Sequence, residues 1–428
     1  MSDRGFLKAL PELEAQGLLS AEQAERIRAH YQSQPGTGTN RGMVLFSILG
    51  GLLIGLGVVL LVAHNWDQLG RGLRTVLALA PMAMTQGLCA WVLLKRSDSR
   101  GWREGTALGL AFMVAAALSL IAQIHQIPGE LEGFLFTWAL LIIGVVYVMR
   151  SVAVALVYLV AITWYGGSLA FDRSTGEEPP WLFIPLLLAI APFFFMQLRQ
   201  HGRSAGFGWL AFFSALALGI GLQFYWEDFR LWHMLAPIAL ASGYTLVPWS
   251  IPDREARVGA FTWLGGATIL GLLFALSWLD FWTSMDDERQ FVSGGDLIPW
   301  IVQVGLGITA YALAWGKRRP FERVLFPEVM WVLPLLLVIG LWMPGIACLL
   351  VNLGLLAIGV VITLHGSHDA AMGRLNLGLA VIATTIAMRF FDLDLSFALR
   401  GLLFIALGIG FLVMNLRTLR AKRNKVHA

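Results

Sequence analysis

The residues best suited to chemistry are acids and aromatics that stand together in short polar stretches between long apolar runs. They are Trp66 with Asp67, Trp226 with Glu227 and Asp228, Asp280 within an aromatic stretch, and Asp392 with Asp394. Carboxylates bind cations or hydroxylated head groups and aromatic rings stack on sugars, so these stretches would form a shallow ligand site if they converged. The plainer interpretation is that Trp prefers the headgroup region of a bilayer and that the acids are solvated.

Another polar stretch, residues 123–130, holds His125 and Glu130 and contains no Lys or Arg. His125 could bind a metal or sense pH, because the unperturbed pKa of histidine is about 6.5. No other His or Cys stands at ligand spacing, so no metal site is predicted. The alternative is a helix end at Pro128, where Gln and His side chains satisfy free carbonyls. Motifs for nucleotides, zinc proteases and serine hydrolases are absent from the sequence, and no cofactor is predicted.

The composition indicates the kind of structure that must position these residues. Of the 428 residues, 57% are hydrophobic and 14% charged, and the mean hydropathy is +0.70. Soluble domains carry charge on about a quarter of their residues. Since one core could not hide so much apolar surface, the excess must face acyl chains. The net charge of +4 reflects basic residues in short loops, so topology explains it better than nucleic acid does.

Apolar runs long enough to cross about 30 Å of hydrocarbon follow one another from residue 43 onward. They predict an all-α membrane protein, a polytopic bundle of about 14 transmembrane helices, with 12 as the lower bound. The predicted spans are 43–63, 75–94, 105–122, 134–149, 152–170, 181–197, 205–225, 231–249, 258–279, 297–315, 326–341, 343–364, 371–388 and 401–417. The divisions at Arg150 and Met343 are needed because each undivided run is too long for one helix.

The Lys and Arg residues predict the orientation of the bundle. With the N-terminus inside, 24 of the 31 basic residues fall in inner segments and seven in outer ones. Basic residues are retained on the cytoplasmic side. An even number of spans and two cytoplasmic termini follow, and the first forty residues show no signal peptide.

The N-terminal part, residues 1–40, reads as a cytoplasmic helical hairpin and a flexible linker ahead of the bundle of residues 41–428. Two short amphipathic helices are expected within residues 5–32. Ser20 and Gln23 have the spacing of a capping box at the start of the second helix. The hairpin could dock a cytoplasmic protein partner through its leucines, or lie against the inner face of its own bundle.

Several motifs together resemble the predicted bacterial membrane proteins of domain of unknown function 2157. These are Gly17-Leu-Leu-Ser20 with Gln23-Ala24, the run from Leu49 to Asp67, and residues 121–125, with a further likeness at residues 389–392 and 400–401. Where relatives tend to have Tyr, this chain has His125. The resemblance implies the bacterial inner membrane and transfers no catalytic residue.

Three hypotheses for function remain open. The first is a carrier or flippase for a lipid-linked or amphipathic substrate, since the spans are almost bare of ionisable residues and a midplane proton relay is disfavoured. The second is a membrane scaffold or sensor that works through the hairpin. The third is an outer-face enzyme acting on lipid-linked sugars, with Asp67, Glu130 and Asp392 as acid, base or ligands.

Overall fold

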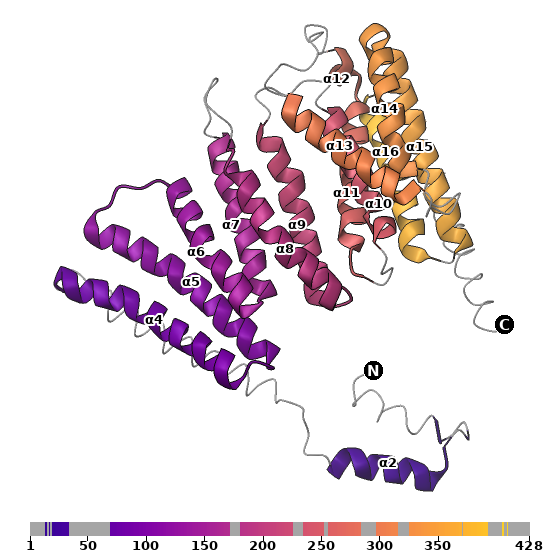
Figure 1. Ribbon diagram of the computed structural model, residues 1–428. Coiled ribbons are helices and arrows are strands. Elements are labelled where there is room, and N and C mark those ends of the chain that lie inside the picture. Colours follow the sequence, from indigo (N-terminus) through magenta and orange to yellow (C-terminus); the bar gives the residue numbers. More distant parts are fainter. Residues whose placement is uncertain are drawn as a thin grey trace. The chain divides into compact units, whose positions relative to one another are not determined.

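The computed structural model consists of helices joined by short turns in the part of the chain that it describes (Figure 1). That part comprises residues 13–14, 17, 19–33, 69–171, 180–225, 234–251, 256–283, 297–315, 325–369, 371–392, 405 and 409. No strand occurs among these residues, which confirms the all-α fold class. The predicted first span, most of the last one and most of the first hairpin helix lie outside the described residues. The chain divides into two units, Met1–Leu77 and Ala78–Ala428, which are described separately.

The helices follow the apolar runs. They are α2 (Ala21–Ser33), α4 (Arg71–Lys95), α5 (Arg100–His125), α6 (Leu131–Met149), α7 (Val152–Phe171), α8 (Phe183–His201), α9 (Ala205–Gly221) with the 3₁₀ turn η2 (Leu222–Tyr225), α10 (Leu235–Ser250), α11 (Gly259–Leu276), α12 (Leu279–Thr283), α13 (Leu297–Ala314), α14 (Leu325–Trp342), α15 (Pro344–His368) and α16 (Met372–Asp392). Twelve of the predicted spans coincide with one of these helices. Eight helices of the described part are long and apolar enough to cross a membrane, so the total of 14 stays a prediction.

Both divisions of the long apolar runs are confirmed. Arg150 ends α6 in the left-handed conformation, with φ 48°, and α7 begins two residues later. Met343 separates α14 from α15, and Pro344 occupies the first turn of α15, where its missing N–H costs nothing.

Residues 279–283 differ from the expected outer loop, because they form the short helix α12. Trp282 is buried, and its indole Nε1 donates a hydrogen bond to the Leu276 carbonyl at 2.7 Å. Its ring lies against Gly340 of α14, where a Cβ atom would collide with it. This Trp therefore belongs to the core of the bundle, whereas its neighbour Asp280 is exposed.

Two clusters of buried apolar side chains hold the second unit together. One joins α5 to α9 around the large residues Tyr158, Phe183, Phe193 and Phe207. The other joins α10, α11, α14 and α15. Two mid-span amides also make hydrogen bonds between helices: Gln303 accepts from Gln223 Nε2 at 3.2 Å, and Asn352 Nδ2 donates to the Ser277 carbonyl at 3.0 Å.

In the first unit, α2 begins with the predicted capping box. The Ser20 backbone N–H donates to Gln23 Oε1 at 3.0 Å, and the Gln23 N–H donates to Ser20 Oγ at 3.2 Å. Each side chain thus satisfies a backbone donor that the first helical turn leaves free. The hairpin as a whole stays a prediction.

Candidate functional site

The predicted outer-face residues are only partly within the described chain. Six of them lie outside the described residues: Trp66, Asp67, Trp226, Glu227, Asp228 and Asp394. Asp392 is the last residue of α16, but its side chain is not part of what the structure describes. Asp280 lies exposed in α12. Among the described residues, no three His, Cys, Asp or Glu side chains lie close enough together to hold a metal ion.

His125 and Glu130 flank the connection between α5 and α6. His125 is the last residue of α5, and Gln126 follows it in the left-handed conformation, with φ 52°. The free carbonyls of this helix end accept from backbone N–H groups, Gln126 to Gln123 at 3.3 Å and Ile127 to Ala122 at 2.9 Å. Backbone N–H groups therefore satisfy two of these carbonyls, and the expected contribution of Gln and His side chains stays a prediction. Glu130 is the exposed N-cap residue of α6, and its side chain makes no capping hydrogen bond.

The best-ordered polar cluster lies at the opposite, basic end of α5, where Glu104 binds the start of α7. Its carboxylate accepts from the Ser151 hydroxyl at 2.5 Å, from the Ala153 N–H at 2.9 Å and from the Val152 N–H at 3.1 Å. An acid at a helix N-terminus also complements the positive end of the helix dipole. This cluster joins two helices, which is a structural role.

Arg103 makes the corresponding contacts on the α6 side, and the Glu104 and Arg103 contacts together are called the clamp here. Its guanidinium donates to the carbonyl of Met149 at 3.1 Å and to that of Arg150 at 3.4 Å. A cation therefore lies at the C-terminus of α6 and an anion at the N-terminus of α7, as the two helix dipoles favour. No role for Glu104 or Arg103 was predicted from the sequence. The only sequence feature that pointed to this junction is Ser151, a residue type that favours helix N-caps, directly after the break at Arg150.

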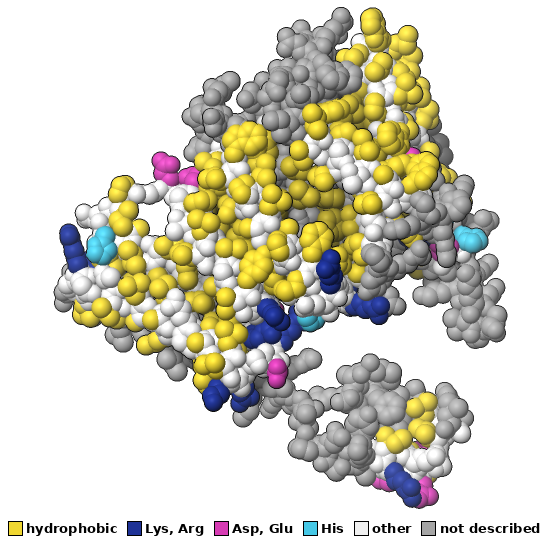
Figure 2. All heavy atoms as spheres, in the orientation of Figure 1, with side chains coloured by type: hydrophobic (Ala, Val, Ile, Leu, Met, Phe, Trp, Pro, Cys, Tyr) yellow, Lys and Arg dark blue, Asp and Glu magenta, His cyan; other side chains and the backbone are white. Residues whose placement is uncertain are grey.

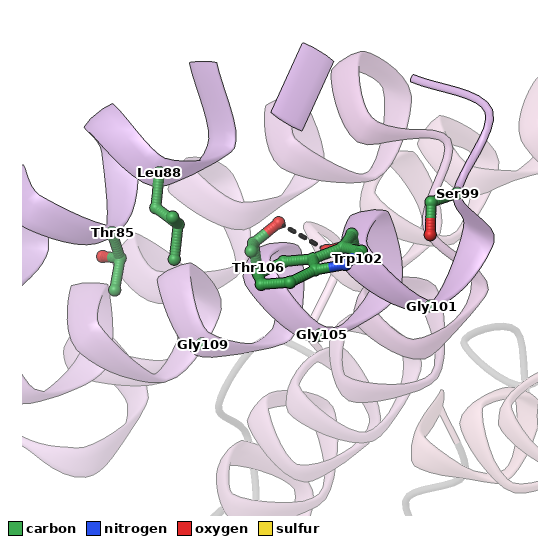
Figure 3. Close-up of a pocket in the computed structure, with 8 residues that line it drawn as sticks. All are labelled: Thr85, Leu88, Ser99, Gly101, Trp102, Gly105, Thr106 and Gly109. Atoms are coloured by element: carbon green, nitrogen blue, oxygen red, sulfur yellow. Dashed lines mark hydrogen bonds between the residues drawn. The ribbon is translucent and has the colours of Figure 1, made fainter. Parts of the chain in front are cut away.

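The first groove of the second unit lies between α4 and α5 and has a volume of about 500 Å³ (Figure 3). Gly101, Gly105 and Gly109 form its α5 side, together with Trp102 and Thr106, and α4 contributes Thr85 and Leu88. The Thr106 hydroxyl points back to the Trp102 carbonyl, to which it donates at 2.8 Å. The groove therefore has a floor of bare backbone and few free polar groups.

The second groove lies between α7 and α9 and has a volume of about 520 Å³. Its lining is almost wholly apolar and includes Trp164, Phe171, Phe213, Ala217, Ile220 and Phe224, with Thr163 and Ser168 as the polar members. Those two hydroxyls donate to their own helix, to Leu159 O at 2.7 Å and to Tyr165 O at 3.1 Å. The rim is open, because Trp164 is 57% and Phe171 93% exposed.

The surface of the helical body agrees with a lipid environment. Figure 2 shows hydrophobic side chains over much of the visible face and most Lys and Arg side chains gathered at one end. Large apolar residues such as Leu94, Trp263 and Trp342 are more than 70% exposed. So much exposed apolar surface on helices of spanning length defines a multi-pass α-helical membrane protein.

The comparison with known families agrees with this class. Residues 11–168 match the family described as "Predicted membrane protein (DUF2157)". The predicted resemblance is confirmed over this range, which extends from the N-terminal segment through most of α7. No curated protein and no solved structure matches the chain.

Proposed function

We propose that this protein carries or flips an amphipathic or lipid-linked substrate, and that the groove between α7 and α9 receives the apolar part of that substrate. The observation that carries the proposal is the combination of an apolar lining with an open, lipid-facing rim. A solid bundle would offer no such path.

The chemistry of the groove suits an aliphatic chain. Neither α7 nor α9 contains Asp, Glu, Lys or Arg. The hydroxyls of Thr163 and Ser168 already donate within α7, so a hydrocarbon chain that enters the groove leaves no donor without an acceptor. Aromatic side chains provide broad contact area for such a chain.

The groove also has the position that a carrier needs. It follows α7 from Leu159 to Phe171, which is the half of the helix that the charge distribution assigns to the outer leaflet. In the proposed orientation, both termini lie in the cytoplasm of a bacterium and a polar head group would lie beside the outer end of α7.

The test is lipid transfer across proteoliposomes by the full chain. Two head-group-labelled fluorescent probes are used, a phospholipid and a polyprenyl diphosphate sugar, and dithionite bleaches the label in the outer leaflet. We expect the wild-type chain to make well over half of at least one probe accessible. Bleaching that stops at about half for both probes would overturn the proposal.

A matched pair of variants locates the path. Thr163→Trp fills the groove, whereas Thr137→Trp places the same ring on the exposed face of α6, away from the groove lining. Both hydroxyls make the same bond to the carbonyl four residues earlier, at 2.7 and 2.8 Å, so the loss of that bond is common to the two variants. Transfer at least tenfold slower in Thr163→Trp than in Thr137→Trp supports the groove as the path, and equal rates contradict it.

A further inference from the structure

The groove between α4 and α5 has the dimensions of one lipid chain. Gly101, Gly105 and Gly109 are each four residues apart and therefore share one face of α5. A Cβ atom at any of the three would have no heavy-atom neighbour within 4 Å in the part of the chain that the structure describes. From Gly101 to Gly109 the helix rises by about 12 Å, close to the thickness of one hydrocarbon leaflet, which is about 15 Å.

Two basic side chains adjoin the end of this groove. Ser99 lines that end, and its N–H donates to the Arg96 carbonyl at 3.0 Å. Lys95 is exposed and adjoins Arg96. Among the described residues, no carboxylate forms an ion pair with Lys95 or Arg96. Arg100 does not belong to this group, because its Nε lies 3.9 Å from a Glu104 oxygen and its guanidinium lies against Gly206 of α9.

Acidic side chains do not cancel this charge. Asp98 is the one carboxylate in the turn between α4 and α5, and it lies against the hydroxyl of Ser97 at 3.4 Å. Lys95 and Arg96 outnumber this single acid. At the same end, Trp91 and Trp102 meet edge to face with ring centroids 5.8 Å apart, as aromatic residues do at the headgroup level of a bilayer.

We propose that the α4–α5 groove is a binding site for a phospholipid with an anionic head group, drawn from the leaflet at the basic end of the bundle. One acyl chain lies along the glycine floor against Leu88, and the phosphate lies beside Lys95 and Arg96. Charge complementarity at the mouth selects an anionic over a zwitterionic lipid, by about fivefold for each basic side chain. This site is separate from the α7–α9 groove and does not depend on the proposed transfer activity.

Photochemical labelling tests the site in the full chain. The protein is reconstituted into phosphatidylcholine vesicles that contain one tenth of either phosphatidylglycerol or phosphatidylcholine with a diazirine in the acyl chain, and the labelled peptides are mapped. We expect phosphatidylglycerol to label residues 85–109 at least fivefold more than phosphatidylcholine does. Equal labelling by the two lipids overturns the proposal, and so does an absence of labelling, which would mean that another part of the chain covers the groove.

Two variants and their controls separate the chain site from the head-group site. Gly105→Leu fills the groove and should lower labelling by phosphatidylglycerol at least fivefold, whereas Gly144→Leu, on an exposed and open face of α6, should leave it unchanged. Arg96→Gln should reduce the preference for phosphatidylglycerol about fivefold, and Arg199→Gln at the same end should not. Wild-type labelling in Gly105→Leu overturns the proposal, as does a preference for phosphatidylglycerol that Arg96→Gln does not reduce.

Discussion

Removal of the Glu104 carboxylate should destabilise the junction of α6 and α7. The carboxylate accepts three hydrogen bonds, from the Ser151 hydroxyl and from the N–H groups of Val152 and Ala153. In Glu104→Ala these three donors lose their common acceptor. The Ser151 hydroxyl still accepts from the Val154 N–H at 3.2 Å, so the helix keeps one side-chain cap.

The expected loss follows from these bonds. A net hydrogen bond to a charged group contributes about 1.5 to 3 kcal/mol, but the Glu104 side chain is 22% exposed and water can replace part of the interaction. Loss of a helix cap alone costs about 1 kcal/mol. We therefore expect Glu104→Ala to lower the free energy of unfolding by about 2 to 4 kcal/mol. Glu104→Gln keeps one acceptor oxygen and should lose about half as much.

Unfolding of the purified protein by dodecyl sulfate in mixed micelles, followed by far-ultraviolet circular dichroism, measures this difference. Asp98→Ala is the control, because this exposed acid in the preceding turn contacts only the neighbouring Ser97 hydroxyl among the described residues. It should change the free energy of unfolding by less than about 0.5 kcal/mol. A Glu104→Ala protein as stable as Asp98→Ala would contradict the claim that Glu104 stabilises the junction of α6 and α7.

The remaining stability predictions concern close contacts inside the bundle. Gly340→Ala should destabilise the chain by about 1 to 3 kcal/mol, because its new methyl group meets the ring of Trp282. Gly354→Ala should be neutral in the same unfolding assay, because its methyl group meets no atom of the described residues within 4 Å. Gln303→Leu should cost about 0.6 to 2 kcal/mol, because the amide of Gln223 loses its partner in α13. A neutral Gly340→Ala, or a Gln303→Leu protein with wild-type stability, would show that these contacts do not form.

Local rules explain why most helix ends were predictable. The break after Arg150 and the start at Pro344 depend on residues within one turn, and so does the capping box of Ser20. The spans themselves follow from the length of apolar runs, which lipid dictates directly.

Contacts between helices were harder to predict from the sequence. Glu104 meets Ser151 across 47 positions of sequence, so its role depends on which helices are neighbours. Gln86 and Asn376 have the same mid-span pattern as Gln303, yet both are exposed on their helices. The burial of Trp282 likewise depends on the glycine opposite it.

The candidate sites were hard to predict from the sequence for the same reason. Glycines recur in many spans, but their spacing does not reveal which are packed. Gly307 contacts the backbone of Ala239 in α10, whereas Gly105 faces an open groove. The α7–α9 groove arises from how two wholly apolar helices meet, and no residue type in either helix marks it in the sequence.

The ratio of transfer rates between Thr137→Trp and Thr163→Trp proteoliposomes tests the central claim most directly. A carrier that passes its substrate along the α7–α9 groove predicts a ratio of at least ten, with wild-type transfer in Thr137→Trp and the same unfolding midpoint for both variants. A ratio near one, or no transfer of either probe by the wild-type chain, would contradict it.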